Sequence, residues 1–324
     1  MTHAIRIHQP GGPEALSWET VEIGEPGPGQ VRLRQTAIGI NFIDIYHRTG
    51  LYPMPLPFTP GQEGAGVVEA VGPGVEDLKP GDRVGYPSLP GGGYAEARLA
   101  PADRLVILPD GIDDKVAASS MLRGMTVRYL IREIHKVGPG DTILIHAAAG
   151  GIGLILCQWA AALGATVIGT VSTDEKAALA RANGCHHPLV VPRENFVARV
   201  AEITEGRKLP VVYDSVGLDT YQGSFDCLRR RGIAVFFGQS SGKVPPIDLG
   251  ILAAKGSLFV TRPSLGHYIT TRGELAATAA DWFDAVLSGK VRVHVNQSFA
   301  LKDAAEAHRA LESRATTGST VLIP

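Results

Sequence analysis

Between residues 141 and 263 the chain alternates short apolar runs with segments of helical length, and no other feature constrains the fold as strongly. The run DTILIHA begins at Asp141, and ATVIGTV, HPLVV, PVVYDSV, GIAVFFG and SLFVTRP follow it. Segments such as DEKAALARANG and ENFVARVAEITEG lie between these runs and have the length and spacing of helices. Strands that alternate with helices of this length predict a parallel, doubly wound sheet.

The sequence on either side of this region has a different pattern. Residues 1 to about 120 are rich in Gly and Pro, and strand-like runs such as VRLRQTAIGI are separated by turns such as PGPGQ. Near the end, TRGELAATAADWFDAVLSGK predicts a long helix, and we expect it and the elements after it to pack on the first domain. The 324 residues suit two domains. The predicted fold class is α/β, with a β-rich domain and a doubly wound parallel-sheet domain.

Composition excludes several classes of protein. The net charge of −1 predicts no polyanionic partner, so nucleic-acid binding is disfavoured. Three cysteines without CxxC spacing predict no disulfide framework. The first residues, MTHAIRIHQPGG, lack the apolar core of a signal peptide, and no apolar run reaches about 18 residues. We therefore expect a cytoplasmic protein with no membrane span.

Two adjacent polar residues, Gln62 and Glu63, lie in a stretch of glycines and small apolar residues, TPGQEGAGVVEAVG. Polar groups in such surroundings need partners, because burying them unpaired costs a few kcal/mol, roughly 1–3 in proteins. Three interpretations are open at this point: half of a metal site, a catalytic pair, or internal hydrogen-bonding braces.

The strongest local motif is a glycine turn between an apolar strand and an apolar helix, ILIHAAAGGIGLI. Ala148, Gly150 and Gly153 occupy the three positions of a GxGxxG fingerprint, with Ala in place of the first Gly. Small residues there let the backbone approach a pyrophosphate, which the N–H groups and dipole of the helix N-terminus attract. The alternative is a glycine-rich packing turn, but the surrounding β/α units favour a dinucleotide site.

The tip of the next strand indicates which dinucleotide binds. An NAD site usually has a carboxylate there, whereas this tip is Thr170-Val171-Ser172-Thr173, followed by Lys176 in the next helix. Hydroxyl groups and a cation suit a 2′-phosphate, so the sequence predicts NADPH. Two alternatives stay open: Asp174 acts only as a helix cap, and Lys176 is only a solvated surface charge.

Five segments, GINFIDIYHRTGLYP, HAAAGGIG, YDSVG, VTRPSL and SRATTGS, resemble the zinc-free quinone oxidoreductases of the medium-chain dehydrogenase/reductase superfamily, the group that contains zeta-crystallin. The resemblance covers essentially the whole chain. It implies a GroES-like catalytic domain over residues 1–123 and 265–324, a Rossmann NADPH-binding domain over residues 124–264, a cofactor in the cleft between them, and a homodimer.

The resemblance also implies where the cofactor is held. Ser172, Thr173 and Lys176 would contact the 2′-phosphate, with Arg314 reaching over from the C-terminal segment. Family members often carry a tyrosine on the third strand, where this chain has Val191 and Pro192; Arg193 is a candidate substitute. For Tyr129 the alternative is core packing. Fingerprint and resemblance together predict these cofactor-binding residues: Phe42, Asp44, Tyr129, Gly150, Gly151, Ile152, Gly153, Ser172, Thr173, Lys176, Ser215, Gly238, Gln239, Ser240, Ser241 and Arg314.

The zinc-containing relatives carry ligands at positions that match Asn41, Gln62 and Glu63. Amides are poor zinc ligands compared with thiolate and imidazole, and residues 1–156 contain no cysteine for a structural zinc site. We therefore predict that no metal is bound, that Glu63 remains as a buried brace, and that Gln62 lines the cleft. Without a Lewis acid, oxidation of an alcohol is disfavoured, whereas a quinone mainly needs to be positioned against the nicotinamide.

Three residues are the predicted catalytic group: Asn41, Tyr46 and Tyr52. Asn41 is predicted to donate a hydrogen bond to the quinone oxygen as that oxygen gains negative charge. Tyr46 and Tyr52 are predicted to stack on the quinone ring or to donate a proton. A loop anchor is the alternative for Tyr52, and Asp44 is better explained as a structural carboxylate than as a base. The predicted activity is NADPH-dependent quinone reduction by hydride or electron transfer. The alternatives are reduction of 2-alkenals or enones and, in a different class, an NADPH-regulated RNA-binding or structural protein.

Overall fold

The computed structural model of the protein describes residues 1–89, 91–191, 193–313 and 316–324. Its fold is α/β, with a β-rich part and a parallel-sheet part, as the sequence predicts. No helix within these residues has both the length and the apolar character that a membrane span requires.

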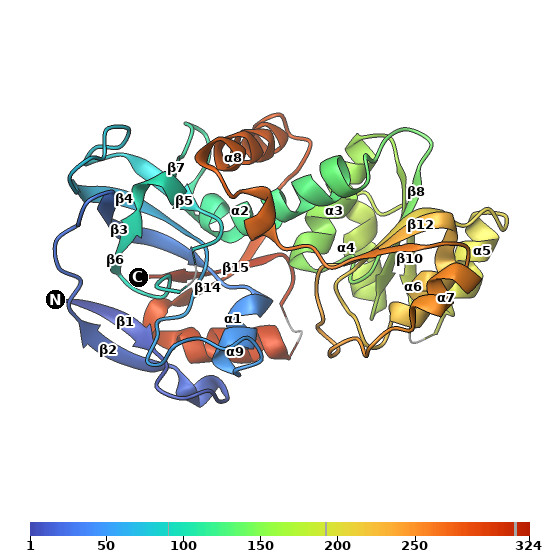
Figure 1. The fold of residues 1–324 in the computed structure, drawn as a ribbon, viewed down its shortest axis with the longest axis horizontal. Coiled ribbons are helices and arrows are strands. Elements are labelled where there is room, and N and C mark those ends of the chain that lie inside the picture. Colours follow the sequence, from blue (N-terminus) through green and yellow to red (C-terminus); the bar gives the residue numbers. More distant parts are fainter. Residues whose placement is uncertain (90, 192, 314–315) are drawn as a thin grey trace. The chain divides into compact units, whose positions relative to one another are not determined.

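The chain divides into two compact units (Figure 1). The first unit contains Met1–Met125, Tyr268–Leu287 and Val293–Pro324, and the second contains Thr126–His267 and Ser288–Arg292. The helix α2, Asp114–Tyr129, begins in the first unit and ends in the second, where a π-helical turn continues it.

The second unit contains a six-stranded parallel sheet in the order β10-β9-β8-β11-β12-β13. The helices α3 and α4 lie on one side of this sheet and α5 and α6 on the other (Figure 1), as right-handed crossovers require when the strand order reverses. The strands are β8 Thr142–Ile145, β9 Thr166–Val171, β10 His187–Val190, β11 Leu209–Asp214, β12 Leu228–Phe236 and β13 Phe259–Thr261. The helices are α3 Gly151–Ala162, α4 Asp174–Ala182, α5 Phe196–Ile203, α6 Tyr221–Cys227 and α7 Leu249–Ala254.

The apolar runs of the sequence form the core of this unit. Leu144, Ile168 and Val212 from three neighbouring strands pack with Val200 of α5 and Phe225 of α6. The central strands β8, β9 and β11 are buried on both faces, which explains why they are continuous apolar runs and not alternating patterns. The carboxyl ends of the strands meet at one edge of the sheet, and that edge carries the glycine turn.

The first unit is built on a sheet in the order β14-β15-β3-β4-β5-β7, with β6 paired to β3. The strand β15 pairs antiparallel with β3, so the C-terminal elements do pack on the first domain. A separate pair, β1 and β2, precedes this sheet in the chain. The strands are β1 Thr2–Arg6, β2 Ser17–Val21, β3 Gln30–Gly39, β4 Gly64–Val71, β5 Arg83–Tyr86, β6 Ala97–Pro101, β7 Val106–Ile107, β14 Val295–Ala300 and β15 Ser319–Ile323.

Three helices complete the first unit: α1 Phe42–Arg48, α8 Arg272–Leu287 and α9 Ala304–Glu312. The helices α1 and α9 lie side by side (Figure 1). Ile45 of α1 packs with Ala307 and Leu311 of α9, in a core that also contains Ile38 and Leu322 of the sheet. This packing fixes α1 directly after the end of β3; α1 carries Tyr46, Asn41 immediately precedes it, and Tyr52 lies in the loop that follows it.

Candidate functional site

Asn41 is the residue between β3 and α1, and hydrogen bonds hold both ends of its side-chain amide. Its Nδ2 donates to Oε1 of Glu63 at 2.7 Å, and its Oδ1 accepts from Nε of Arg123 at 3.0 Å. The residue is 6% exposed. Because the oxygen faces a guanidinium and the nitrogen a carboxylate, only one orientation of the amide satisfies both neighbours.

Glu63 is fully buried directly before β4 and accepts a second hydrogen bond, from the backbone N–H of Leu122 at 2.8 Å. Burial raises the pKa of Glu63 to about 7, and Arg123, Asn41 and Leu122 oppose that shift. Two donors and a nearby guanidinium stabilise the carboxylate form, and burial outweighs them in the net shift. The interpretation of Glu63 as an internal brace is therefore confirmed. Gln62 lies beside it and contacts Nδ1 of His47 at 3.5 Å.

Arg123, which the sequence analysis did not single out, joins three segments of the first unit: its own helix α2, the junction of β3 and α1, and the start of β15. Besides Asn41, it donates to the carbonyl of Ile40 at 2.7 Å, to Oγ of Ser319 at 2.6 Å and to the carbonyl of Gly318 at 3.3 Å. Burial lowers its pKa, while Glu63 and Asp44 raise it. A single charged residue in the apolar helix AASSMLRGMT was the available signal, because such a residue needs buried partners.

Asp44, a predicted cofactor residue, points into the first unit and is fully buried. Its Oδ2 accepts from the N–H of Asn41 at 2.8 Å and from the hydroxyl of Tyr94 at 3.4 Å, and Tyr94 contacts Nε2 of His308 at 2.9 Å. Among the residues that the structure describes, Oδ1 has no hydrogen-bond partner. Burial raises the pKa of Asp44 to about 7. Its contact with the cofactor stays a prediction.

Tyr46 and Tyr52 lie together, with ring centroids 5.3 Å apart in an edge-on arrangement. The backbone N–H of Tyr52 donates to the carbonyl of Tyr46 at 3.0 Å, which fixes the loop after α1 on the helix. Two more rings extend this group. The ring centroid of Phe42 lies 6.5 Å from that of Tyr46, and the ring centroid of His47 lies 6.1 Å from that of Tyr52. Both tyrosines are partly exposed, so α1 and the loop after it present an aromatic surface.

The glycine turn of the second unit follows β8 and leads into α3. Ala147 adopts φ of +54°, and the N–H of Gly150 donates to its carbonyl at 2.9 Å. A Cβ at Gly153 would lie 2.3 Å from that carbonyl oxygen, so the turn closes only around glycine. The first N–H groups of α3, which begins at Gly151 and continues through Ile152, have no partner within the helix. This cradle of small residues fits a dinucleotide pyrophosphate.

The tip of β9 differs from one expectation. Thr173, not Asp174, is the N-cap of α4, and its hydroxyl oxygen accepts from the N–H of Lys176 at 3.2 Å. Asp174 instead accepts two hydrogen bonds from Arg193, at 2.6 and 2.9 Å. Ser172 is exposed beside them. Arg314, a predicted contact of the 2′-phosphate, lies outside the described residues, as does Pro192, which stands near the position of the family's tyrosine.

Two further predicted cofactor segments contact each other after β11 and β12. The N–H of Ser240 donates to the carbonyl of Ser215 at 3.1 Å, and the N–H of Ser241 to Val216 at 2.9 Å. A Cβ at Gly238 would lie 2.6 Å from the carbonyl oxygen of Ser215. The run that contains Gln239 is therefore packed tightly on the turn after β11. Tyr129 is 2% exposed, in the second unit.

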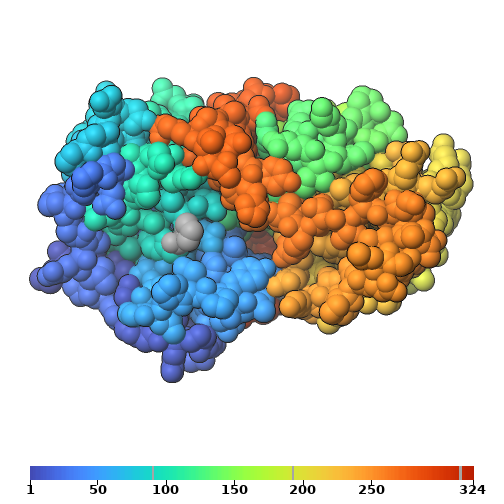
Figure 2. Space-filling model, viewed as in Figure 1, coloured from blue at the N-terminus to red at the C-terminus, as the bar shows by residue number. Residues whose placement is uncertain are grey.

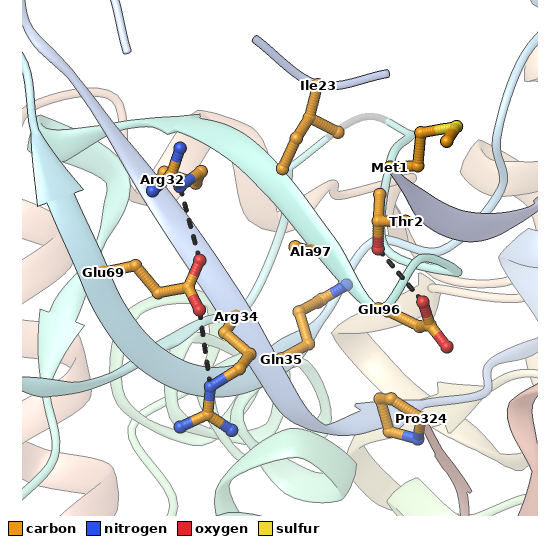
Figure 3. Close-up of a pocket in the computed structure, with 10 residues that line it drawn as sticks. All are labelled: Met1, Thr2, Ile23, Arg32, Arg34, Gln35, Glu69, Glu96, Ala97 and Pro324. Atoms are coloured by element: carbon orange, nitrogen blue, oxygen red, sulfur yellow. Dashed lines mark hydrogen bonds and ion pairs between the residues drawn. The ribbon is translucent and has the colours of Figure 1, made fainter. Parts of the chain in front are cut away.

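A surface pocket of about 540 Å³ lies elsewhere in the first unit (Figure 3). Arg32 and Arg34 line it, but both pair with Glu69, at 3.3 and 3.5 Å. Glu96 on the opposite side accepts from the hydroxyl of Thr2 at 3.1 Å. The lining contains none of the predicted site residues, and its cations are already paired, so this pocket does not alter the candidate site.

The chain matches known proteins over its full length. Residues 27–110 match the family described as alcohol dehydrogenase GroES-like domain, and residues 151–285 the family described as zinc-binding dehydrogenase. It is 52% identical over 325 residues to the quinone oxidoreductase of Pseudomonas aeruginosa, with both chains fully covered. A 2-haloacrylate reductase of Burkholderia sp is 50% identical over 335 residues, covering 100% of this chain and 99% of that protein. The structure of Escherichia coli quinone oxidoreductase complexed with NADPH has a TM-score of 0.97 and 49% identity, covering 99% of this chain and 100% of that one.

Proposed function

The chain belongs to the quinone oxidoreductases of the medium-chain dehydrogenase/reductase superfamily, and from this premise we propose that it uses NADPH to reduce quinones. The observation that carries this proposal is the full-length identity of about half to relatives named quinone oxidoreductase, one of which was solved with NADPH. The glycine cradle before α3 supports it, because it has the shape that a dinucleotide requires.

In the second unit, the glycine turn at Gly150–Gly153 binds the pyrophosphate, and the tip of β9 binds the 2′-phosphate. Ser172, Thr173 and Lys176 supply hydroxyls and a cation there, and Arg193 lies beside them, bound to Asp174. NADPH supplies a hydride from the nicotinamide ring. The loops at Ser215 and Gly238–Ser241 orient the ribose and pyrophosphate.

In the first unit, Asn41, Tyr46 and Tyr52 bind the quinone. Nδ2 of Asn41 uses one hydrogen on Glu63, and the amide has a second hydrogen that can be donated to the quinone oxygen as negative charge develops on it. Arg123 and Glu63 hold the amide in one orientation, so it needs no reorganisation during the reaction. The tyrosine rings provide a surface for a planar substrate.

We propose that this chemistry needs no zinc, although one matched family is described as zinc-binding dehydrogenase. The support is the chemistry of the side chains: Asn41 and Gln62 are neutral amides, and Asn41 is bound to both Glu63 and Arg123. Metal analysis of the purified protein tests the proposal; a stoichiometric zinc ion whose removal abolishes activity would contradict it.

We also propose a homodimer in the cytoplasm. The strand β13 is an edge of the parallel sheet, and it exposes Phe259 and Val260 at 59% and 37%, while Leu249 of the preceding helix is 76% exposed. Figure 2 shows residues 249–261, in orange, at the surface. A second copy of the edge would cover these side chains and pair the free backbone groups. Sedimentation velocity with Phe259→Asp tests this: a dimer should become a monomer.

Stopped-flow oxidation of bound NADPH tests the activity. A panel of benzoquinones and naphthoquinones should accelerate the loss of NADPH absorbance, with the quinone reduced in equal amount. The 2-haloacrylate reductase at 50% identity supports a second candidate, reduction of an activated alkene. A panel of 2-haloacrylates, enones and 2-alkenals separates the two. If only the alkenes accelerated oxidation, the quinone assignment would be wrong and the cofactor assignment would stand.

A further inference from the structure

The second unit contains a fully buried imidazole, His146, directly between the end of β8 and the glycine turn. Its Nδ1 lies 2.9 Å from Oγ1 of Thr170 in β9, and its Nε2 lies 3.0 Å from Oγ of Ser224 in α6. Ser224 in turn donates to Oδ2 of Asp214, at the end of β11, at 2.8 Å. One side chain therefore joins the carboxyl ends of three adjacent strands.

These contacts determine the tautomer of His146. The hydroxyl of Ser224 donates its only hydrogen to Asp214, so its oxygen must accept from Nε2–H of the imidazole. Nδ1 then carries no hydrogen and accepts from the hydroxyl of Thr170. The hydrogen bonds run in one direction, from Thr170 through His146 and Ser224 to the carboxylate. Although Ser, His and Asp are the residues of hydrolase triads, this direction and complete burial leave the serine no role as a nucleophile.

The chain of hydrogen bonds ends on a carboxylate that shapes a loop. Oδ1 of Asp214 accepts from the N–H groups of Val216 and Gly217 at 2.8 and 3.0 Å, and the hydroxyl of Thr220 donates to both oxygens. The turn formed in this way carries Ser215 and supports Ser240 and Ser241. At the other end, Thr170 lies two residues before Ser172, and its carbonyl accepts from the N–H of Ala148 in the glycine turn at 3.0 Å.

We propose that His146 is a positioning residue for NADPH, which it never contacts: its neutral Nε2–H tautomer holds the glycine turn, the tip of β9 and the turn after β11 in the relative positions that the cofactor requires. The proposal rests on the proposed use of NADPH. A cofactor that contacts three loops at once binds well only if their spacing is fixed before binding, because ordering them on binding would cost free energy. Burial lowers the pKa of His146, with Asp214 opposing, so the imidazole stays neutral in this environment.

The dissociation constant of NADPH, measured by quenching of protein fluorescence at a temperature where every variant is folded, tests the proposal. His146→Leu leaves the hydroxyl of Thr170 and the oxygen of Ser224 without their partner, and we expect NADPH to bind about tenfold more weakly, equivalent to about 1.4 kcal/mol. His146→Gln, which can donate and accept, should recover part of this loss. In turnover, KM for NADPH should rise while KM for the quinone stays unchanged.

Two further variants keep the test decisive. Ser224→Ala removes one hydroxyl and covers the case in which His146→Leu fails to fold; it should weaken NADPH binding severalfold. Thr204→Val is the control, since Thr204 is equally buried and bonds Val200 and the N–H of Lys208, but at the amino end of β11, away from the loops. It should lower thermal stability without affecting the dissociation constant.

Each outcome has one meaning. If His146→Leu and Ser224→Ala lower thermal stability but bind NADPH as the wild type does, His146 is only structural and the proposal is wrong. If the wild type itself does not bind NADPH, the proposed function fails instead. Hydrogen exchange of the free protein gives a readout that does not depend on the cofactor: residues 147–153 and 215–217 should exchange faster in both variants than in Thr204→Val.

Discussion

Nδ2 of Asn41 donates to Oε1 of Glu63 at 2.7 Å, in the interior of the first unit. Oε2 of the same carboxylate accepts from the N–H of Leu122, and Arg123 donates to the other end of the amide. The orientation of Asn41 therefore depends on a carboxylate with both oxygens occupied. A neutral isostere cannot reproduce this arrangement, because one of its two polar atoms would be a donor that faces another donor.

Glu63→Gln should therefore disorient Asn41. The amide of the variant would place its NH₂ against either Asn41 or Leu122, and the lost hydrogen bond should cost about 1–3 kcal/mol of stability. If Asn41 stabilises the quinone oxygen, kcat should fall at least tenfold, while the dissociation constant of NADPH changes less than twofold. Steady-state kinetics and a binding titration measure the two effects.

Glu96→Gln is the matched control for this variant. Glu96 also lies in the first unit and also accepts from a backbone N–H, that of His3 at 2.8 Å, but it lies on the surface pocket and not beside Asn41. It should keep wild-type kinetics. If Glu63→Gln kept the kcat of the wild type, the role assigned to the orientation of Asn41 would be wrong.

The sequence predicted the long, strongly patterned elements and the local motifs. The parallel strands are apolar runs of sufficient length, and the glycine turn is recognisable because Gly153 has no room for a side chain. The helix α1 was missed, because FIDIYHR is short and mixes β-branched with aromatic residues. The pair of β1 and β2 was also missed, since THAIR and SWETV are short and neither is bounded by clear turn residues.

The residues that orient the site were harder to predict than those that form it. Arg123 lies 82 positions from Asn41 in the sequence, and His146 lies 78 positions from Ser224. Their roles depend on which segments the fold brings together, and the local sequence carries no pattern for that. Thr173 shows a smaller ambiguity: it and Asp174 are both good caps, and only the geometry of the backbone selects between them.

Lys176→Ala should weaken the binding of NADPH about tenfold and leave that of NADH almost unchanged, because NADPH carries the 2′-phosphate that this charge is proposed to bind and NADH does not. Arg181→Ala is the control. It removes the same charge from the last turn of α4, about 7.5 Å further along the helix axis, and should affect neither cofactor. Fluorescence titrations give the dissociation constants of NADPH and NADH for each variant, and each constant is compared with that of the wild type. If Lys176→Ala lost equal affinity for NADPH and NADH, Lys176 would not bind the 2′-phosphate.

The stability that Asp44 and Glu63 contribute should decrease as the pH rises from 6.5 to 8. Burial raises the pKa values of Asp44 and Glu63 to about 7 from ordinary values near 4, so below pH 7 the folded protein holds protons that the unfolded chain releases. Raising the pH removes those protons and the stability that they contribute. His146 and His308 act in the opposite sense between about pH 6 and 7, because burial lowers their pKa values and mainly the unfolded chain binds their protons there.

The share of Asp44 in this effect can be isolated by Asp44→Asn. Between pH 6.5 and 8 the variant should lose less stability than the wild type, because one of the two groups with a raised pKa is gone. Asp103→Asn, at an exposed position, should keep the wild-type slope. Differential scanning calorimetry at four pH values is sufficient. A slope in Asp44→Asn equal to that of the wild type would mean that Asp44 is ionised in the folded protein throughout this range.

The glycine turn allows a comparison of two matched substitutions. At Gly153 a Cβ would lie 2.3 Å from the carbonyl oxygen of Ala147 and 2.8 Å from backbone atoms of Ala148, so the backbone must move. At Gly150 the only close atom is the same oxygen at 3.2 Å, and φ of −77° is open to any residue. Gly153→Ala should therefore destabilise the protein without cofactor by about 2 kcal/mol or more, and Gly150→Ala by under about 1 kcal/mol. Urea unfolding without NADPH measures both, and equal costs would show that the close contact at Gly153 relaxes freely and does not define the turn.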